Sequence, residues 1–524
     1  MAEQDGTFDY IVAGAGCAGC VVANRLSADS SRSVLLLEAG GNDDFFQSTR
    51  MLDLASLFSL WTPATDWGYS TEPSPGANNR ALPITQGKVL GGGSSTNGRI
   101  YLRGNRRDYD HWASMGAEGW SYHEVLPYFK RYEDYSGGES EYHGVGGPVS
   151  VIDLPEPTPV SQAFMQAGID HGFKGPVDVN AAIQEDAISY CQSTTTHDLH
   201  RASTAVAYVH PIVDRPNFTL KTEAMVTRIL FEGTRAVGVE YVEGGQTKQA
   251  RANEEVVCSF GGFNEPKMLM LSGIGPADRL KSLGIPVVAD LPGVGQNLMD
   301  HLLVRLSWHL KQKQPSLIIL SEVNLFTYTP DAPRDDSPNL QYMYAPFFFP
   351  EYGALDAGIT LVPVVARPES RGSVTLRSSN PMDPPVIDIN YLSSDVDVGV
   401  LQYGIELGRE LMSSPHLEPF KGDEVVPGPD LTTKEQLEEY IRNTAVTVWH
   451  PCGTARMGSD DMAVVDPQLR VRGVEGLRVA DCSVMPRITN ANLQATVIMI
   501  GEKAADMILS GDRELTTTSK EQAQ

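Results

Sequence analysis

Residues 8–38 decide the fold, and they read FDYIVAGAGCAGCVVANRLSADSSRSVLLLE. A short apolar run of strand type over 8–13 leads into a glycine-rich turn at 14–19. A helical pattern follows over 21–26, and a second apolar run of strand type covers 33–37. A strand, a glycine-rich turn, a helix and a second strand form the unit that binds dinucleotides in doubly wound α/β proteins. The sequence therefore predicts an α/β fold that begins with a Rossmann-like domain.

The three glycines of this turn have separate expected roles. Gly14 permits the tight turn, Gly16 lets the backbone approach a pyrophosphate, and Gly19 allows helix and strand to pack closely. Cys17 and Ala18 lie in the turn before the helix, whose N-terminus is expected to offer free N–H groups to the phosphates. We predict that all five residues contact a dinucleotide.

Glu38 completes the pattern at the end of the second strand. A carboxylate at this place accepts hydrogen bonds from the ribose hydroxyls of a bound dinucleotide. Its negative charge disfavours the 2′-phosphate of NADP, whereas the turn by itself does not distinguish NAD from FAD.

The composition excludes several classes of protein. The chain has 524 residues, with 41 Lys and Arg against 66 Asp and Glu, so its formal net charge is −25. Such an acidic protein lacks the positive surface that nucleic acids and anionic membranes require. The first residues lack the basic and apolar regions of a signal peptide, and no apolar run reaches the ~18 residues of a membrane span. We expect a cytoplasmic monomer or homodimer of two to four domains, with no nucleic-acid partner, no membrane and no metal site.

Longer motifs follow along the chain. Residues 86–112 read QGKVLGGGSSTNGRIYLRGNRRDYDHW, and residues 261–276 read GGFNEPKMLMLSGIGP. Further motifs are PGVGQNLMDH at 292–301, WHPCGTARMG at 449–458 and VADCSVMP at 479–486. In this order, they resemble the signatures of the glucose–methanol–choline (GMC) oxidoreductases, and the resemblance spans nearly the whole chain.

This resemblance implies FAD as the cofactor and a two-domain fold. A Rossmann-like FAD-binding domain is expected at 1–156, 208–302 and 447–511. A substrate-binding domain, built on an antiparallel sheet with helices, is expected at 157–207 and 303–446, and 512–524 are expected to be a disordered tail. Beyond the first turn, the residues that match cofactor-contacting positions of the family are Val89, Gly92, Ser95, Asn97, Gly98, Arg99, Ile100, Val226, Trp449 and Asp481.

Some members of the family bind FAD covalently through a histidine in the Ser-Ser-x-Asn loop. This chain has Thr96 at that position. Threonine cannot make the bond, so we predict non-covalent FAD.

Two residues match the catalytic pair of the family. His450 is the expected base, since an imidazole exchanges a proton near neutral pH. Asn492 falls on the second position and is expected to donate a hydrogen bond to the substrate oxygen. A His/Asn pair resembles the choline oxidase and furfuryl-alcohol oxidase branch. The predicted reaction is oxidation of a primary alcohol to the aldehyde by hydride transfer to flavin N5, with O2 as acceptor and H2O2 as product.

The aromatic segment 339–352 is the expected wall of the substrate pocket. Read as a strand, it places Tyr342 and Tyr344 on one face, with Phe348 further along and Trp449 beside the catalytic base. The alternative for these tyrosines is the core of a sheet. The sequence does not identify the alcohol, although an apolar pocket is favoured over a sugar site.

Two other functions stay open. A dehydrogenase on the same scaffold would pass electrons to a quinone or another carrier. Val448 favours the oxidase, because choline oxidase and furfuryl-alcohol oxidase also have valine two residues before the histidine. A flavin-dependent lyase such as the fatty-acid photodecarboxylase is a remote alternative, since that enzyme needs a cysteine where Ala366 precedes Arg367.

Overall fold

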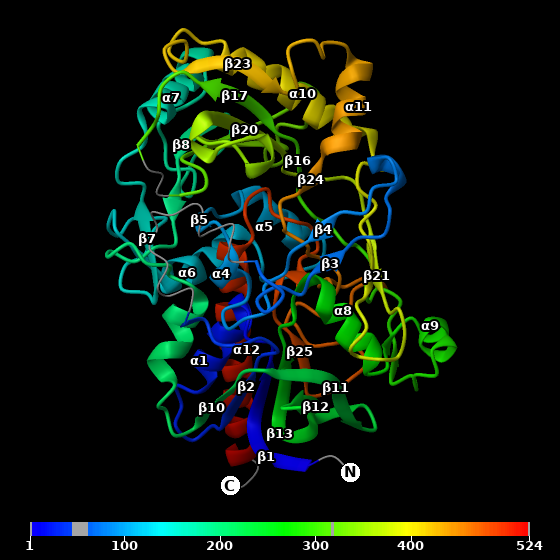
Figure 1. Cartoon of the computed structure of the whole chain (residues 1–524). Coiled ribbons are helices and arrows are strands. Elements are labelled where there is room, and N and C mark those ends of the chain that lie inside the picture. Colours follow the sequence, from blue (N-terminus) through cyan, green and yellow to red (C-terminus); the bar gives the residue numbers. More distant parts are fainter. Residues whose placement is uncertain (1–2, 45–60, 316–318, 522–524) are drawn as a thin grey trace.

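A computed structural model describes residues 3–44, 61–315 and 319–521, the side chains of 512–521 excepted. Two large sheets organise the molecule, as Figure 1 shows. A mainly parallel sheet occupies the lower half of that view, and an antiparallel sheet occupies the upper half. Both termini lie at the lower end.

The lower sheet is the dinucleotide-binding sheet that residues 8–38 predicted. Its strands in spatial order are β10 (Phe218–Lys221), β2 (Val34–Leu37), β1 (Glu3–Ala13), β13 (Gln246–Cys258), β12 (Arg235–Glu243) and β11 (Ala224–Glu232), with β25 (Leu477–Val479) also beside β13. Ala13 of β1 lies level with Leu37 of β2 and with Cys258 of β13, and all three strands are parallel. The loops that follow them therefore meet at one edge of the sheet, the edge at which α/β proteins bind ligands.

Two helices from opposite ends of the chain cover this sheet together. Helix α1 (Cys17–Leu26) packs against α12 (Gln494–Glu521). Eight of the ten residues of α1 are buried, which explains the absence of charge over most of its length. Helix α12 continues into the segment 512–524 that was expected to be a disordered tail, and its backbone is helical as far as Glu521.

The upper sheet is antiparallel throughout. Its strands in spatial order are β23 (Lys421–Val426), β17 (Leu306–Leu310), β20 (Gly358–Val365), β19 (Leu340–Ala345), β18 (Val323–Thr327) and β8 (Ala187–Tyr190), and β16 (Leu302–Leu303) pairs with both β20 and β24 (Val446–Thr447). The pairing of β16 with β24 is functionally important. It brings residues 300–301 and 448–450 side by side, although 149 positions separate the two histidines in them.

Three helices cover the outer face of the upper sheet. They are α7 (Pro159–His171), α10 (Asp395–Met412) and α11 (Lys434–Thr444). Each begins with a side-chain cap: Thr158, Ser394 and Thr433 accept hydrogen bonds from backbone N–H groups in the first turn. Helix α10 packs on β20 and on α7.

Smaller elements connect the two sheets. A mixed sheet has the order β5 (Ile100–Tyr101), β9 (Gln192–Ser193), β7 (Val149–Asp153) and β6 (Glu133–Tyr135). The remaining helices are α4 (Gly93–Thr96), α5 (Arg106–Ser114), α6 (Tyr122–Tyr132), α8 (Gly261–Leu271) and α9 (Ala277–Ser282). The remaining strand pairs are β3 (Tyr69–Ser70) with β4 (Pro83–Ile84), β14 (Ile274–Gly275) with β15 (Ala289–Asp290), and β21 (Ser373–Thr375) with β22 (Val386–Asp388).

The predicted fold class is confirmed, since a parallel nucleotide-binding sheet is combined with an antiparallel sheet that carries helices. The residue bounds given above for the two domains stay predictions.

Candidate active site

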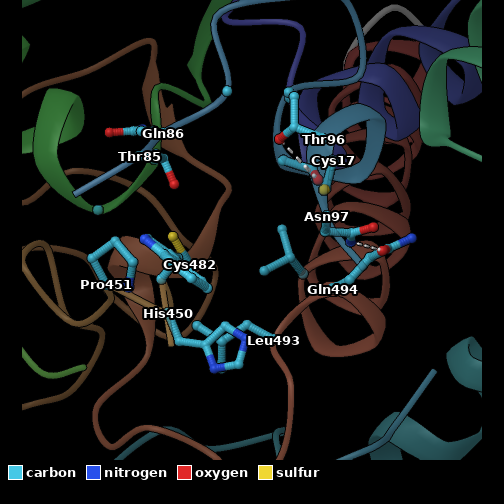
Figure 2. Close-up of a pocket in the computed structure, with 18 of the residues that line it drawn as sticks. Cys17, Thr85, Gln86, Thr96, Asn97, His450, Pro451, Cys482, Leu493 and Gln494 are labelled. Atoms are coloured by element: carbon cyan, nitrogen blue, oxygen red, sulfur yellow. Dashed lines mark hydrogen bonds between the residues drawn. The ribbon is translucent and has the colours of Figure 1, made fainter. Parts of the chain in front are cut away.

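A cavity lies between the two sheets and is lined by residues of both. It runs from the glycine turn after β1 to the loop that carries His450. Figure 2 shows Cys17, Thr96 and Asn97 on one side of this space, with His450 at the far end and Pro451 on the other side.

Close backbone contacts explain the glycines of the first turn. Gly14 has φ +98°, and a Cβ atom there would stand 2.4 Å from the carbonyl oxygen of Ser259. A Cβ on Gly19 would stand 1.9 Å from the carbonyl oxygen of Gly14. Gly16 precedes α1, whose N-terminus is not capped by a side chain, so its first N–H groups are available to a ligand. Gly14, Gly16, Cys17 and Ala18 line the cavity.

Glu38 lies at the end of β2 and lines the cavity beside this turn. Its carboxylate accepts hydrogen bonds from the backbone N–H of Ala15 at 3.0 Å and of Gly40 at 2.8 Å. Burial raises the pKa of Glu38 to about 7. The two backbone donors hold the carboxylate at the edge where the ribose of a dinucleotide is expected.

The second glycine loop touches the first. Gly92 has φ +53°, and a Cβ there would stand 2.8 Å from the Cα of Gly16. The residues of this loop that line the cavity are Gly92, Gly93, Thr96, Asn97, Gly98, Arg99 and Ile100.

Two predicted residues of this loop do not line the cavity. The Ser95 hydroxyl donates to the carbonyl oxygen of Leu90 at 2.7 Å, and its side chain is fully buried. Val89 is buried as well. The side chains of both residues are therefore turned away from the cavity, and a contact with the cofactor stays a prediction that only their backbone could fulfil.

Asp481 and Val226 line the same end of the cavity. Asp481 accepts hydrogen bonds at 2.7 Å from the backbone N–H of Gly261 and from that of Ser483. Gly261 begins α8, so the carboxylate joins the C-terminal motif to the start of that helix.

His450 makes hydrogen-bond contacts with His301, Asn492 and Asp300, and a further contact orients His301. Its Nδ1 lies 2.9 Å from Nδ1 of His301, and the other nitrogen of His301, Nε2, lies 3.0 Å from the carbonyl oxygen of Ala366. Its Nε2 lies 3.4 Å from the amide nitrogen of Asn492. The backbone N–H of His450 donates to the carboxylate of Asp300 at 2.7 Å.

These contacts determine where the protons of the two neutral imidazoles lie. A carbonyl oxygen only accepts, so Nε2 of His301 must carry a proton, which leaves its Nδ1 as an acceptor. His450 must then donate from Nδ1, and its Nε2 carries the lone pair, which faces the amide nitrogen of Asn492 at 3.4 Å. Burial holds the pKa of His450 well below its usual value of about 6.5, and burial also lowers the pKa of His301 to about 4, so both rings are neutral.

Asn492 and Trp449 lie beside this lone pair and line the cavity. The Oδ1 atom of Asn492 is buried and has no hydrogen-bond partner among the described residues. Trp449 has φ +63°, a conformation that directs the chain into the cavity between Val448 and His450.

The aromatic residues of β19 do not line the cavity. Tyr342 donates its hydroxyl to the carbonyl oxygen of Gly404 in α10 at 2.6 Å, and Tyr344 stacks on Phe164 of α7 with 4.2 Å between ring centroids. Both tyrosines and Phe348 are fully buried. The predicted pocket wall is therefore wrong for these three residues. Helices cover the face of β19 that carries the two tyrosines, and Phe348, which follows the strand, packs against His309 of β17. The opposite face presents Met343 and Ala345 to the cavity.

Sequence reasoning missed three residues of the site. His301 and Asp300 lie in the motif 292–301, which was assigned no role, and only the pairing of β16 with β24 brings them to His450. Gln494 accepts a hydrogen bond from the amide of Asn97, and its own Nε2 is buried without a partner among the described residues (Figure 2). Its position two residues after Asn492 was the available signal.

The described part of the chain shows neither a metal cluster nor a membrane-spanning helix. No group of three or more His, Cys, Asp or Glu residues there could hold a metal ion. No described helix is long and apolar enough to cross a membrane.

Comparison with known proteins identifies the class. Two models of the GMC oxidoreductase family match residues 8–303 and 368–501. The oxygen-dependent choline dehydrogenase of Escherichia coli O17:K52:H18 (strain UMN026 / ExPEC) is 42% identical over 534 residues, covering 96% of each chain. The chain therefore belongs to the GMC oxidoreductase family, and it is an FAD-dependent enzyme that oxidises CH–OH groups.

Solved structures agree with this assignment. Pyridoxine 4-oxidase from Mesorbium loti superposes with a TM-score of 0.88 at 29% identity, covering 95% of this chain and 98% of the other. A formate oxidase superposes with a TM-score of 0.90 at 27% identity, covering 98% and 100%.

The cavity fits FAD. Its lower end combines a glycine cradle, an uncapped helix N-terminus and the carboxylate of Glu38, which are the donors and acceptors that a pyrophosphate and a ribose need. The unpartnered Nε2 of Gln494 and Oδ1 of Asn492 lie in the lining near His450, where the flavin ring and the substrate would supply partners.

Proposed function

We propose that the protein oxidises a primary alcohol to the aldehyde, with His450 as the base and O2 as the electron acceptor. The observation that carries this proposal is the lone pair on Nε2 of His450, which the Ala366 carbonyl and His301 together leave unprotonated and which makes only a long contact of 3.4 Å with the Asn492 amide. A neutral imidazole whose lone pair lies in the cavity lining can accept the hydroxyl proton of an alcohol.

Asn492 assists at the same oxygen. Its amide nitrogen is 3.4 Å from Nε2 of His450, so an alcohol oxygen placed between them could donate to the histidine and accept from the asparagine. As the proton leaves, negative charge develops on that oxygen and the amide N–H stabilises it. FAD, which the glycine turns and Glu38 would hold, would supply the acceptor for the hydride of the carbon and pass the two electrons on to O2.

The FAD is proposed to be non-covalent. Thr96 lines the cavity at the position where some relatives have a histidine, and its hydroxyl cannot form that bond. Acid precipitation should leave the yellow chromophore in the supernatant. Chromophore retained in the pellet would contradict this.

The identity of the electron acceptor distinguishes two candidate functions, an oxidase and a dehydrogenase. Val448 lines the cavity directly before Trp449, and a small side chain there leaves room for O2. A dehydrogenase that uses a quinone or another carrier is the second candidate. The 42% identical relative is named an oxygen-dependent choline dehydrogenase, and that name does not decide between the two. The lyase has no support, because Ala366 occupies the position that requires a cysteine.

The test is turnover of a panel of primary alcohols in air, with and without an added dye. Peroxide release equal to aldehyde formed, without dye, supports the oxidase. Turnover that requires the dye supports the dehydrogenase, and no bleaching of the flavin by any alcohol under anaerobic conditions would contradict both. The cytoplasmic location and the monomeric or homodimeric state stay predictions, which fractionation and light scattering can test.

A further inference from the structure

The substrate end of the cavity has an apolar wall. Leu303, Met343 and Val362 come from three neighbouring strands of the upper sheet, and Ile100 and Val448 pack in the same cluster. Apolar walls of this kind hold the carbon body of a substrate, while a few polar groups orient it.

The charged groups of the lining are distributed unequally. Glu38 and Asp481 are the carboxylates among the described lining residues, and both lie at the end with the glycine turns. The lining also has the cations Arg99, Lys267 and Arg305, and Arg305 adjoins the apolar wall. Arg305 follows Leu303 by two residues, and its guanidinium carbon lies 4.2 Å from the centroid of the Phe349 ring, which also lines the cavity.

Arg305 has an unused hydrogen-bond donor. One of its terminal nitrogens, Nη1, makes an ion pair with Glu351, but its Nε is buried and has no acceptor among the described residues. Only 14% of the side chain is exposed. A buried charged donor without an acceptor is costly, so a ligand that supplies an acceptor binds with a clear advantage.

The chemistry of a guanidinium indicates which acceptor fits. Its planar N–H groups match a carboxylate with two parallel hydrogen bonds. The ring of Phe349 holds the plane of the guanidinium in place by stacking. A quaternary ammonium group, in contrast, would meet no carboxylate among the described lining residues of this end, because the nearby Glu351 carboxylate is outside the lining and already paired with Arg305.

We propose that Arg305 recognises a carboxylate on the substrate, so that the preferred substrates are hydroxymethyl aromatic carboxylates and choline is a poor one. This inference rests on the proposed function and specifies its substrate class. The apolar wall holds the aromatic body, Arg305 binds the carboxylate, and the hydroxymethyl group is directed to His450 and Asn492.

The first experiment compares 4-(hydroxymethyl)benzoate, 4-methylbenzyl alcohol and choline as substrates of the holoenzyme and of Arg305→Met. Charge-assisted hydrogen bonds give an expected preference of about 10- to 100-fold in kcat/KM for the carboxylate in the wild type. Arg305→Met should remove that preference, chiefly by raising KM for 4-(hydroxymethyl)benzoate. Equal rates for the first two substrates in the wild type, or a preference for choline, would overturn the inference while the proposed function stands.

A second experiment does not depend on turnover. Benzoate has the carboxylate but no alcohol, and Trp61 and Trp449 in the lining report its binding by fluorescence. Benzoate should bind the wild type about 10- to 100-fold more tightly than Arg305→Met, and toluic amide should not distinguish the two. Glu351→Gln is the matched control: it keeps the arginine and should bind benzoate at least as well as the wild type. Equal benzoate affinity for wild type and Arg305→Met would refute the role of Arg305, whatever the enzyme oxidises.

Discussion

The two ends of the cavity have different kinds of lining. At the cofactor end the lining is mostly backbone, and the glycines there are required because other chain segments pass within contact distance, as Ser259 does at Gly14. At the substrate end the lining is made of side chains that project from one face of the upper sheet, such as Met343 and Val362.

This difference explains what each end tolerates. A backbone cradle depends on the absence of side chains, so any added Cβ disturbs it. A sheet face depends on which of two alternating sets of side chains is directed inward, so neighbouring residues have unrelated roles. The following variants test that contrast, beginning with the chemical groups that both ends present to the substrate.

The largest effect is expected for His450→Ala. Removal of the base should slow flavin reduction by about 10²–10⁴-fold. FAD should remain bound, since backbone groups and Glu38 hold it. Anaerobic stopped-flow bleaching measures the rate, and the absorbance ratio of protein to flavin confirms occupancy. A variant with full FAD and a rate within tenfold of wild type would remove His450 from the mechanism.

The second-largest effect is expected for Asn492→Ala. This variant should slow flavin reduction by about 10²–10³-fold, the usual cost of removing one donor to a developing oxyanion. The double variant with His450→Ala should lose less than the product of the two effects, because both groups act on one oxygen. The same stopped-flow assay applies. Strict multiplication of the two losses would show that they act independently.

His301 is expected to affect the rate of flavin reduction because it fixes which nitrogen of His450 carries the proton. In His301→Phe nothing accepts from Nδ1 of His450, so the tautomer is no longer held, and flavin reduction should fall by about 10- to 100-fold. His301→Asn can donate to the Ala366 carbonyl and accept from His450, so it should restore most of the rate. Thermal unfolding of both variants separates this role from packing, and equally slow Phe and Asn variants of equal stability would contradict it.

A matched pair of glycines tests the backbone cradle. A Cβ on Gly40 would stand 2.0 Å from the carbonyl oxygen of Lys88, whereas a Cβ on Gly41 would have no atom within 4 Å. Gly40→Ala should lower the free energy of unfolding by about 1–3 kcal/mol and weaken FAD binding. Gly41→Ala should stay within about 0.5 kcal/mol of wild type. Chemical denaturation and flavin titration measure both quantities, and equal behaviour of the two variants would argue against a cradle set by close contacts.

The smallest effect is expected on β19, where two adjacent residues face opposite sides. Tyr342→Phe loses one buried hydrogen bond to Gly404, so stability should fall by about 1 kcal/mol while KM stays unchanged. Met343→Ala enlarges the substrate end and should change kcat/KM for an aromatic alcohol by at least about fivefold. Steady-state kinetics and thermal unfolding of the two variants check this. A KM effect of Tyr342→Phe would mean that the tyrosine face serves the substrate after all.

Much of the cofactor end could be predicted because its signals are local. The spacing of Gly14, Gly16 and Gly19 and the position of Glu38 follow from a single strand–turn–helix–strand unit, in which every contact is made within 30 residues or against a neighbouring strand. The same reasoning does not place the side chains of Ser95 and Val89, since a motif identifies a loop but does not say which of its side chains face outward.

The substrate end required the tertiary structure. The alternation in 339–345 correctly placed Tyr342 and Tyr344 on one face of a strand. The sequence of a single strand does not show which of its two faces lines the cavity. That is decided by α7 and α10, which pack on the face that carries the tyrosines. The partnership of His301 with His450 arises from strands that pair across 149 positions, a distance over which no sequence period carries information.

The sequence by itself determined the fold class, the family, FAD as cofactor and the two residues proposed for catalysis, because each depends on short segments whose backbone geometry is dictated by glycine, by strand and helix periodicity, or by a motif that keeps its spacing. The tertiary structure alone decided which face of β19 lines the cavity, which nitrogen of His450 holds the proton and where Arg305 lies. These properties depend on contacts between segments far apart in the chain, and such contacts exist only once both sheets have folded and packed.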